Sequence, residues 1–304
     1  MGKLSVNLCG IELSNPVIPA SGTFGFGYEF AELYDINCLG TFSFKGTTRD
    51  PRFGNPTPRI AECTAGMINA VGLQNPGVEK VISEELPKLA KCFHKPVMAN
   101  VSGFSVADYA YTCEKLDKEE QVGWLEVNIS CPNVKAGGAA FGTDPKLAEM
   151  VISAVRNATT LPLITKLSPN VTSIAEFARI AEACGSDAVS LINTLSAMAI
   201  DIETRRPKLA NLTGGLSGPA VKPVAIKMVH DVYQAVKIPI IGMGGICNGA
   251  DAVEFLIAGA SAVAVGTANF VDPFAPLEVI DFINEYLDRH NFKSVAELTG
   301  ALIK

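Results

Sequence analysis

The chain has 304 residues, of which 48% are hydrophobic and 18% charged, and its formal net charge is −6. This is the composition of a globular protein with ample material for a large core. The sequence has no basic stretch, no apolar run of the ~18 residues that a membrane span needs, and no signal-peptide pattern, so we expect no nucleic-acid or membrane partner.

The eight cysteines are widely scattered, and no CxxC pair occurs among them. A large chain does not need disulfides for stability, and the spacing suits neither a zinc site nor an iron–sulfur cluster. We therefore expect free thiols, no metal site, and a reducing compartment, the cytoplasm.

Eight short apolar runs recur along the chain, each followed by a polar or glycine-bearing turn. They are nearly continuous in apolar residues, which is typical of parallel strands buried on both faces. The predicted strands are Val17–Ala20, Gly40–Phe44, Pro96–Val101, Trp124–Ile129, Pro162–Leu167, Asp187–Ile192, Pro239–Met243 and Ser261–Val265.

Helical patterns separate most of these runs. Asp144 is suited to cap a helix with Pro145 at its first position, and Gly185 is a stop signal for the next helix. The predicted helices are Pro76–Cys92, Asp144–Val155, Ile174–Cys184, Pro219–Val236, Ala250–Ala258 and Pro276–Leu287. This alternation predicts an α/β fold, a (β/α)8 TIM barrel in which residues 1–304 form one domain; a doubly wound sheet is the alternative.

Three segments fall outside the repeat. Residues 3–13 are predicted to form a short β-hairpin before the barrel. Residues 46–75 and 194–218 follow predicted strands and are expected to be long irregular loops, which are often functional in a compact domain.

In a barrel the active site lies at the carboxyl ends of the strands. Lys45 and Lys166 each close an apolar run, which is unusual for a solvated lysine. Asn100, Asn128 and Asn193 lie at three other strand ends. Each asparagine alone could be a turn former, but together they suggest recognition of a ring that carries donors and acceptors.

Glycines follow the last two predicted strands. Gly244 and Gly245 follow the seventh strand, and Gly266 and Thr267 follow the eighth. Backbone N–H groups at these places hold phosphate in many barrels. We therefore predict a phosphate site there.

Cys131 lies just beyond the fourth strand, in a Ser-Cys-Pro turn over the expected mouth of the barrel. The simplest alternative is a buried packing residue. The predicted strand ends carry no histidine and no carboxylate, so the usual general bases are absent. A thiol near Lys45 and Lys166 would have its thiolate favoured, and we interpret Cys131 as a reactive thiol.

Six longer motifs then indicate a family: SFKGTT (43–48), MINAVGLQNPG (67–77), VNISCPNV (127–134), GGLSGPAVKP (214–223), IIGMGGI (240–246) and AVAVGTA (262–268). They resemble the dihydroorotate dehydrogenases from about residue 3 to the C-terminus. The wording of the second and fourth motifs is similar to the catalytic subunit of the NAD-linked class, class 1B. The quinone-linked membrane class has an N-terminal extension and a serine in place of Cys131.

The resemblance implies oxidation of (S)-dihydroorotate to orotate on FMN, in de novo pyrimidine (UMP) biosynthesis. Cys131 would take the C5 proton, Lys166 would stabilise the reduced flavin, and Lys45 would contact flavin and substrate. The implied FMN contacts are Ser21, Lys45, Gly46, Asn100, Asn128, Lys166, Ile192, Gly218, Gly244, Gly245, Gly266 and Thr267. The implied substrate contacts are Lys45, Asn69, Ala70, Val71, Gly72, Leu73, Asn128, Asn193 and Thr194. The glycine-rich segment 131–143 is expected to open for the substrate and to close over the thiol.

The reduced flavin needs an electron acceptor. GTFGFG at 22–27 lacks the spacing of a dinucleotide fingerprint and the acidic residue that should follow it. The class resemblance therefore implies a partner subunit with FAD and a [2Fe-2S] cluster. The assembly would be a heterotetramer with two copies of each subunit, including a homodimer of this chain.

Three alternatives stay open. The first is a fumarate-linked dihydroorotate dehydrogenase. The second is a flavin barrel similar to the pyrimidine-reducing domain of dihydropyrimidine dehydrogenase, which would act on uracil or thymine. The third is a barrel that binds a phosphate ligand without catalysis, and a colourless purified protein would favour it.

Overall fold

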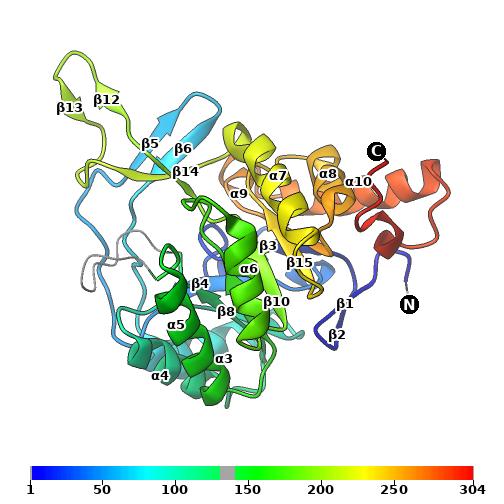
Figure 1. Cartoon of the computed structure of the whole chain (residues 1–304), viewed down its shortest axis with the longest axis horizontal. Helices are drawn as coiled ribbons and strands as arrows, with labels where there is room; N and C mark the ends of the chain where they lie inside the picture. Colours follow the sequence, from blue (N-terminus) through cyan, green and yellow to red (C-terminus); the bar gives the residue numbers. More distant parts are fainter. Residues whose placement is uncertain (1, 131–140, 304) are drawn as a thin grey trace.

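The computed structural model describes residues 2–130 and 141–303. At its centre is a sheet of eight parallel strands with helices around it (Figure 1). The neighbours in the sheet follow the order β3-β16-β15-β10-β9-β8-β7-β4. The strands are β3 (Val17–Pro19), β4 (Ser43–Thr47), β7 (Val97–Val101), β8 (Val122–Asn128), β9 (Leu163–Lys166), β10 (Ala188–Leu191), β15 (Ile240–Met243) and β16 (Ala262–Val265).

The edge strands β3 and β4 are bridged by the segment that follows β3. The Lys45 N–H donates to the Gly25 carbonyl at 2.8 Å. Ring contacts reinforce this link, with centroids 5.0 Å apart for Phe24 and Phe42 and 5.7 Å apart for Phe26 and Phe44. The sheet is therefore a nearly closed barrel, and the predicted (β/α)8 fold is confirmed.

The helices begin and end at residues with clear local causes. The Asp144 carboxylate accepts from the N–H groups of Lys146 and Leu147, with Pro145 at the first helical position, as predicted. Gly185 follows the sixth helix with a positive φ of 88°. The longer helices are α4 (Val106–Leu116), α5 (Pro145–Ala158), α6 (Ile174–Ala183), α7 (Lys222–Tyr233), α8 (Gly249–Ala258) and α10 (Ala275–Arg289).

Shorter helical pieces complete the layer. The predicted helix 76–92 is a continuous run of α2 (Val78–Lys80), a π-helical turn η2 (Val81–Glu85) and α3 (Leu86–Leu89). The others are α1 (Tyr28–Ala31), η1 (Ile36–Cys38), η3 (Pro219–Val221), α9 (Ala268–Val271) and η4 (Val295–Leu298). Helix α4 was not predicted. It begins after Ser105, whose side chain caps the helix by accepting from the Asp108 N–H.

The predicted hairpin is present as β1 (Val6–Leu8) paired antiparallel with β2 (Ile11–Leu13). It lies across the end of the barrel opposite the strand carboxyl ends, since the indole N–H of Trp124 in β8 donates to the Leu8 carbonyl at 3.0 Å. The two ends of the chain meet on one side of the molecule, where the Val295 N–H donates to the Lys3 carbonyl.

The expectation for the second strand is wrong by three residues. We predicted Gly40–Phe44, but β4 is Ser43–Thr47, so Lys45 and Gly46 lie inside the strand rather than beyond it. The error arises because β4 carries polar residues toward the interior: Ser43 is buried and donates to Glu126 at 2.8 Å. The apolar run Gly40–Phe44 therefore includes the residues before the strand and only the first two residues of β4.

The expectation of irregular loops at 46–75 and 194–218 is also wrong. These segments form an antiparallel sheet in the order β11-β14-β6-β5, and a ribbon, β12–β13, extends from it (Figure 1). Its strands pair residues far apart in sequence, such as Gly215 with Asn69, and are too short to show a periodicity. They are β5 (Ile60–Cys63), β6 (Gly66–Asn69), β11 (Leu195–Ala197), β12 (Ile200–Asp201), β13 (Arg206–Pro207) and β14 (Gly214–Ser217).

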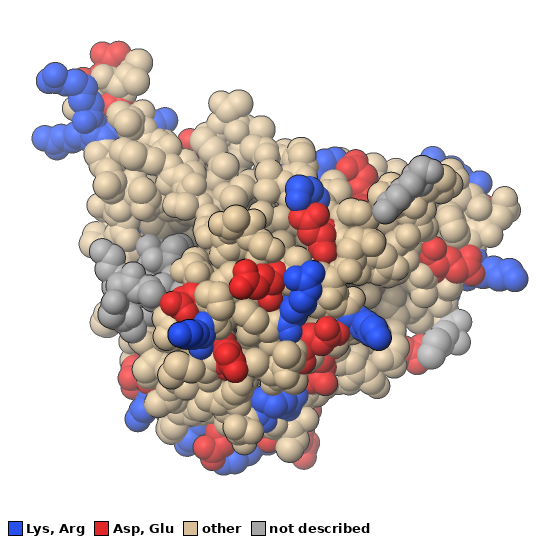
Figure 2. Space-filling view, viewed as in Figure 1, with Lys and Arg blue, Asp and Glu red and all other residues tan. Residues whose placement is uncertain are grey.

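Charges of both signs are mixed over α5 and α6 on the face drawn in Figure 2. Within residues 2–130 and 141–303, no helix is long and apolar enough to cross a membrane. The seven cysteines of this part of the chain are all unpaired.

Candidate active site

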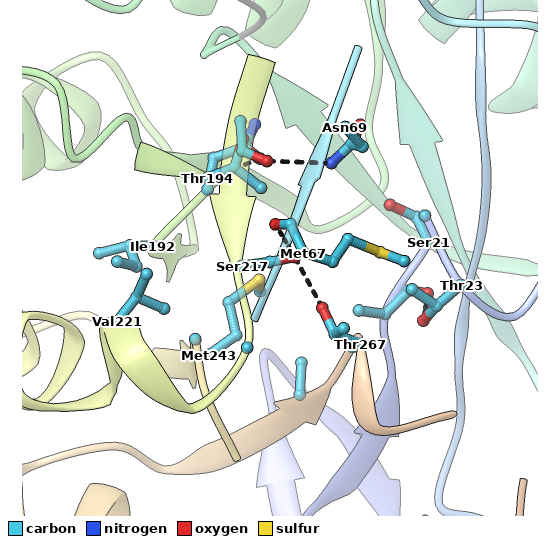
Figure 3. Close-up of a pocket in the computed structure, with 18 of the residues that line it drawn as sticks. Ser21, Thr23, Met67, Asn69, Ile192, Thr194, Ser217, Val221, Met243 and Thr267 are labelled. Atoms are coloured by element: carbon cyan, nitrogen blue, oxygen red, sulfur yellow. Dashed lines mark hydrogen bonds between the residues drawn. The ribbon is translucent and has the colours of Figure 1, made fainter. Parts of the chain in front are cut away.

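A cavity lies at the carboxyl ends of the barrel strands, beneath the antiparallel sheet. Residues from β4, β7, β8 and β9 line it. Met67 and Asn69 of β6 and Ser217 of β14 line it from the antiparallel sheet (Figure 3). Among the predicted site residues, those that line the cavity are Ser21, Lys45, Gly46, Asn69, Val71, Gly72, Leu73, Asn100, Asn128, Lys166, Ile192, Asn193, Thr194, Gly218, Gly244, Gly245, Gly266 and Thr267.

Among the described residues, Ala70 is the one predicted site residue that is not in this lining. Ala70 is 1% exposed and packs with Ile68 and Leu209 in a small second core that is separate from the barrel core. Its neighbours alternate along β6 and beyond, so Asn69 and Val71 face the cavity while Ala70 faces away. Cys131 lies outside the described residues.

The glycine-rich wall has the features of an anion cradle. Gly245 has a φ of +84°, and a Cβ there would come within 2.8 Å of Lys222 Cβ and 2.9 Å of the Gly218 carbonyl oxygen. The N–H groups of Gly245, Gly266 and Thr267 donate to no acceptor in the part of the chain that the structure describes. Free backbone N–H groups in a tight glycine turn suit a phosphate.

The loop that carries Gly245 is fixed by the start of α8. The Asn248 side chain accepts from the Asp251 N–H at 3.0 Å, and the Asp251 carboxylate accepts from the N–H groups of Asn248 and Cys247 at 3.2 and 2.9 Å. This reciprocal pair is a capping box. Lys222 also binds Asp251 at 2.7 Å, which joins the start of α7 to the start of α8.

Two lysines face the cavity from β4 and β9. Neither ammonium group has a hydrogen-bond or ion-pair partner among the described residues. Burial lowers the pKa of Lys45, and the positive charge of Arg59 lowers it further. Lys166 is only 6% exposed. A polar ligand with negative charge would satisfy both groups.

Side-chain amides converge beside the two lysines. The Asn128 side-chain oxygen accepts from the Ser130 hydroxyl at 2.8 Å and from the Asn193 amide at 3.2 Å. The Asn193 amide also donates to Ser130 at 2.6 Å, and its oxygen accepts from the Thr194 N–H at 2.8 Å. These bonds fix the orientation of the amides before a ligand arrives.

Asn69 reaches the cavity from the antiparallel sheet. Its amide donates to the Gly215 carbonyl at 3.4 Å, across the β6–β14 pair. The antiparallel sheet that sequence patterns did not predict therefore supplies one of the predicted ligand residues.

The rest of the lining is apolar, and much of it was not predicted. Met67, Val221 and Met243 project toward the cavity with Ile192 (Figure 3). Nearby, the Thr267 hydroxyl donates to Ser217 at 2.7 Å. Apolar walls between polar groups suit an aromatic ring system that carries a phosphate tail.

One buried carboxylate lies behind the lining and was also not predicted. Glu126, in the middle of β8, is 2% exposed. Burial tends to raise its pKa, but the positive charge of Lys166 and hydrogen bonds from Asn100, Ser190 and Ser43 outweigh this, and the pKa is lowered. A lone carboxylate in the apolar run Trp-Leu-Glu-Val was the signal that could have identified it.

The comparisons with known proteins agree with this geometry. A family model described as "Dihydroorotate dehydrogenase" matches residues 3–287. The chain belongs to the dihydroorotate dehydrogenase family. A relative from Bacillus pumilus (strain SAFR-032), named "Dihydroorotate dehydrogenase B (NAD(+)), catalytic subunit", is 56% identical over 297 residues, 98% of this chain and 96% of its own length.

A second relative of the same name, from Bacillus cytotoxicus, is 54% identical over 300 residues, 99% of this chain and 97% of its own length. The predicted resemblance to the NAD-linked catalytic subunits of the dihydroorotate dehydrogenases is therefore confirmed. A crystal structure of the Eimeria tenella DHODH in complex with ferulenol is similar in fold, with a TM-score of 0.81, 24% identity, and coverage of 98% of this chain and 88% of the other.

Proposed function

We propose that this chain oxidises (S)-dihydroorotate to orotate on a bound FMN, as the catalytic subunit of an NAD-linked enzyme of pyrimidine biosynthesis. The observation that carries the proposal is one cavity that combines a glycine cradle, a half-buried and a buried lysine that have no hydrogen-bond or ion-pair partner among the described residues, and a cluster of fixed amides. Family membership gives these features a common purpose.

The cavity suits FMN. The free N–H groups of Gly245, Gly266 and Thr267 would hold its phosphate, and a side chain at Gly245 would displace this turn, because its Cβ would press on Lys222 and the Gly218 carbonyl. Met67, Ile192 and Met243 would contact the ring system. The remaining proposed flavin contacts are Ser21, Lys45, Gly46, Asn100, Asn128, Lys166 and Gly244. When bound, FMN supplies the acceptor for the hydride that leaves C6 of dihydroorotate.

The substrate would lie against the amide cluster. Asn69, Asn128 and Asn193 offer donors and acceptors to a pyrimidine edge of alternating N–H and C=O groups. The Lys45 ammonium suits the substrate carboxylate, because burial leaves its charge without another partner. The other proposed substrate contacts are Ala70, Val71, Gly72, Leu73 and Thr194; for Ala70 only the backbone is available, since its side chain packs away from the cavity.

Cys131 would remove the C5 proton as a thiolate. Breaking the C5–H and C6–H bonds leaves a C5=C6 double bond in orotate, with the proton on sulfur. Ser130, the residue before Cys131, is buried and bonded to Asn128 and Asn193, so the last described residue before Cys131 lies at the proposed substrate site. Lys166 would stabilise the negative charge that the hydride brings to the flavin.

The assembly follows from the same class assignment. The relatives are named catalytic subunits, which implies a separate subunit. We assign to that partner an FAD and a [2Fe-2S] cluster, in a heterotetramer built on a homodimer of this chain. Residues 1–304 would act as one flavin-binding domain in the cytoplasm, where unpaired thiols are common.

Anaerobic titration of the purified yellow protein would test the proposal. Dihydroorotate should bleach the visible flavin absorbance, and dihydrouracil, which lacks the carboxylate, should not. Orotate should likewise bind far better than uracil. Bleaching by dihydrouracil alone would favour the dihydropyrimidine dehydrogenase type of chemistry, and a colourless protein that cannot take up FMN would contradict the proposal.

A further inference from the structure

Beneath the cavity, the barrel interior contains a polar cluster centred on Glu126. Three donors from three other strands meet its carboxylate: Ser43 of β4 at 2.8 Å, Asn100 of β7 at 2.6 Å and Ser190 of β10 at 2.8 Å. Every member is at most 3% exposed. Glu126 and the two serines are not part of the cavity lining, whereas Asn100 is.

The cluster is joined to the lining lysine by strand register. Asn128 of β8 pairs with Lys166 of β9, and Lys166 pairs with Ser190 of β10. Glu126 lies two residues before Asn128, so its side chain faces the same side of β8. The described residues contain no direct ion pair between Glu126 and Lys166. The two opposite charges therefore act on each other through the barrel interior, where screening by water is weak.

We infer that Glu126 is a positioning residue for the flavin site: it fixes Asn100 as a hydrogen-bond acceptor toward the cavity and offsets the charge of Lys166. This inference rests on the proposed flavin in this cavity.

The orientation of the Asn100 amide follows from the donors and acceptors around it. An ionised carboxylate only accepts, so Asn100 must direct its NH₂ group at Glu126. The Asn100 side-chain oxygen then lies on the other side, beside Gly46, where a Cβ would be 2.9 Å from it. In that orientation the Asn100 side-chain oxygen can accept a hydrogen bond from a ligand N–H. One N–H of its NH₂ group is already bonded to Glu126.

Glu126 also sets the net charge of the barrel interior beside Lys166. Burial favours a neutral Glu126, but the donors and the charge of Lys166 keep it ionised, as its lowered pKa indicates. With Glu126 ionised and Lys166 protonated, the pair is neutral as a whole. Removal of the carboxylate charge would leave Lys166 unopposed, and an unopposed cation stabilises a reduced, negatively charged flavin more strongly.

The test is the midpoint potential of the bound flavin in the holoenzyme. Glu126→Gln should raise this potential by at least about 30 mV, the equivalent of a tenfold gain in binding of the reduced over the oxidised two-electron form. Glu85→Gln is the matched control, since Glu85 is also a buried carboxylate with two partners, Tyr28 and Lys88, but lies outside the cavity lining. It should leave the potential unchanged.

If Glu126→Gln does not fold, a second variant tests the same inference. The triple change Ser43→Ala, Glu126→Met and Ser190→Ala removes the charge together with two of its donors, so fewer buried groups are left unpaired. It should shift the potential in the same direction. An unchanged or lower potential in a folded, flavin-loaded variant would overturn the inference, and so would an equal rise in Glu85→Gln. A wild-type protein that takes up no flavin, or is not reduced by dihydroorotate, would instead contradict the proposed function.

Discussion

Lys45 illustrates how a functional residue can oppose folding. Its ammonium group is buried beside the charge of Arg59 and has no partner among the described residues, so its pKa is lowered from the ordinary value of 10.5. The folded chain therefore holds this proton less tightly than the unfolded chain does. The resulting destabilisation is fully present below the lowered pKa and disappears as the pH rises toward 10.5.

We therefore expect Lys45→Met to stabilise the ligand-free protein at pH 7 while weakening substrate binding. The thermal midpoint should rise by at least about 2 °C, the effect of 1 kcal/mol in a large domain. Scanning calorimetry from pH 7 to pH 10.5 should show this gain shrinking. The matched change Lys91→Met removes an exposed lysine and should do neither. A lower midpoint for Lys45→Met at pH 7 would refute the argument.

At the residue scale, most of the candidate site could be predicted from strand ends and motifs. Lys45, Lys166 and the asparagines were identifiable because polar groups that close apolar runs have few other reasons to be there. Glu126 was not, because its partners, Ser43, Asn100 and Ser190, come from separate strands and only the register brings them together. Ala70 shows the converse case, since a motif also includes residues whose side chains face away from the cavity.

At the scale of single elements, the Gly245 turn carries the most specific prediction. An alanine there would need a positive φ of 84° and would press on Lys222 and Gly218. Gly245→Ala should lower the free energy of unfolding by about 1–3 kcal/mol. It should also reduce the preference for FMN over riboflavin, because the turn must shift to relieve these contacts and its N–H group moves with it.

Gly10→Ala is the control for this prediction. Gly10 has a similar φ of 89°, but a Cβ there would meet nothing within 4 Å. It should carry only the backbone part of the destabilisation and keep the preference for FMN. Equal FMN and riboflavin affinities in wild type, measured by fluorescence quenching, would contradict a phosphate site at Gly245.

The start of α8 supports this turn. Asn248→Ala removes the capping side chain and should lower the free energy of unfolding by about 1 kcal/mol, as measured by urea titration. Asn248→Ser should recover most of the loss, because serine also caps. If serine were as destabilising as alanine, the capping bond would not be the cause.

The elements themselves were predicted unevenly. The barrel strands other than β4 and the longer helices other than α4 were found because each is a continuous apolar or amphipathic run next to a clear turn. The strands β6, β11 and β14 were missed because their antiparallel pairing, of 66–69 and of 195–197 with 214–217, is non-local; β5 pairs locally with β6, but each of the four strands has only three or four residues. The local sequence pattern cannot predict long-range pairing of this kind. These strands nevertheless contribute residues to the cavity.

At the scale of the whole molecule, we expect the two subunits to carry out separate steps of the reaction. The isolated chain should be reduced by dihydroorotate but should not pass electrons to NAD⁺, since no dinucleotide fingerprint occurs in its sequence. Co-purification from the native source should yield a complex that contains iron and reduces NAD⁺. Rapid fumarate reduction by an iron-free, isolated chain would point to the fumarate-linked class instead.

The measurement that tests the central claim most directly is the rate of flavin reduction by dihydroorotate in a stopped-flow spectrometer, without oxygen. We expect fast bleaching in wild type and in Cys38→Ala, which removes an exposed thiol. Cys131→Ala should keep its flavin and its affinity for orotate but bleach slower by a factor of about 10²–10⁴, the usual contribution of a general base. Fast bleaching of Cys131→Ala would contradict the role of this thiol, and no bleaching of the wild type would contradict the substrate.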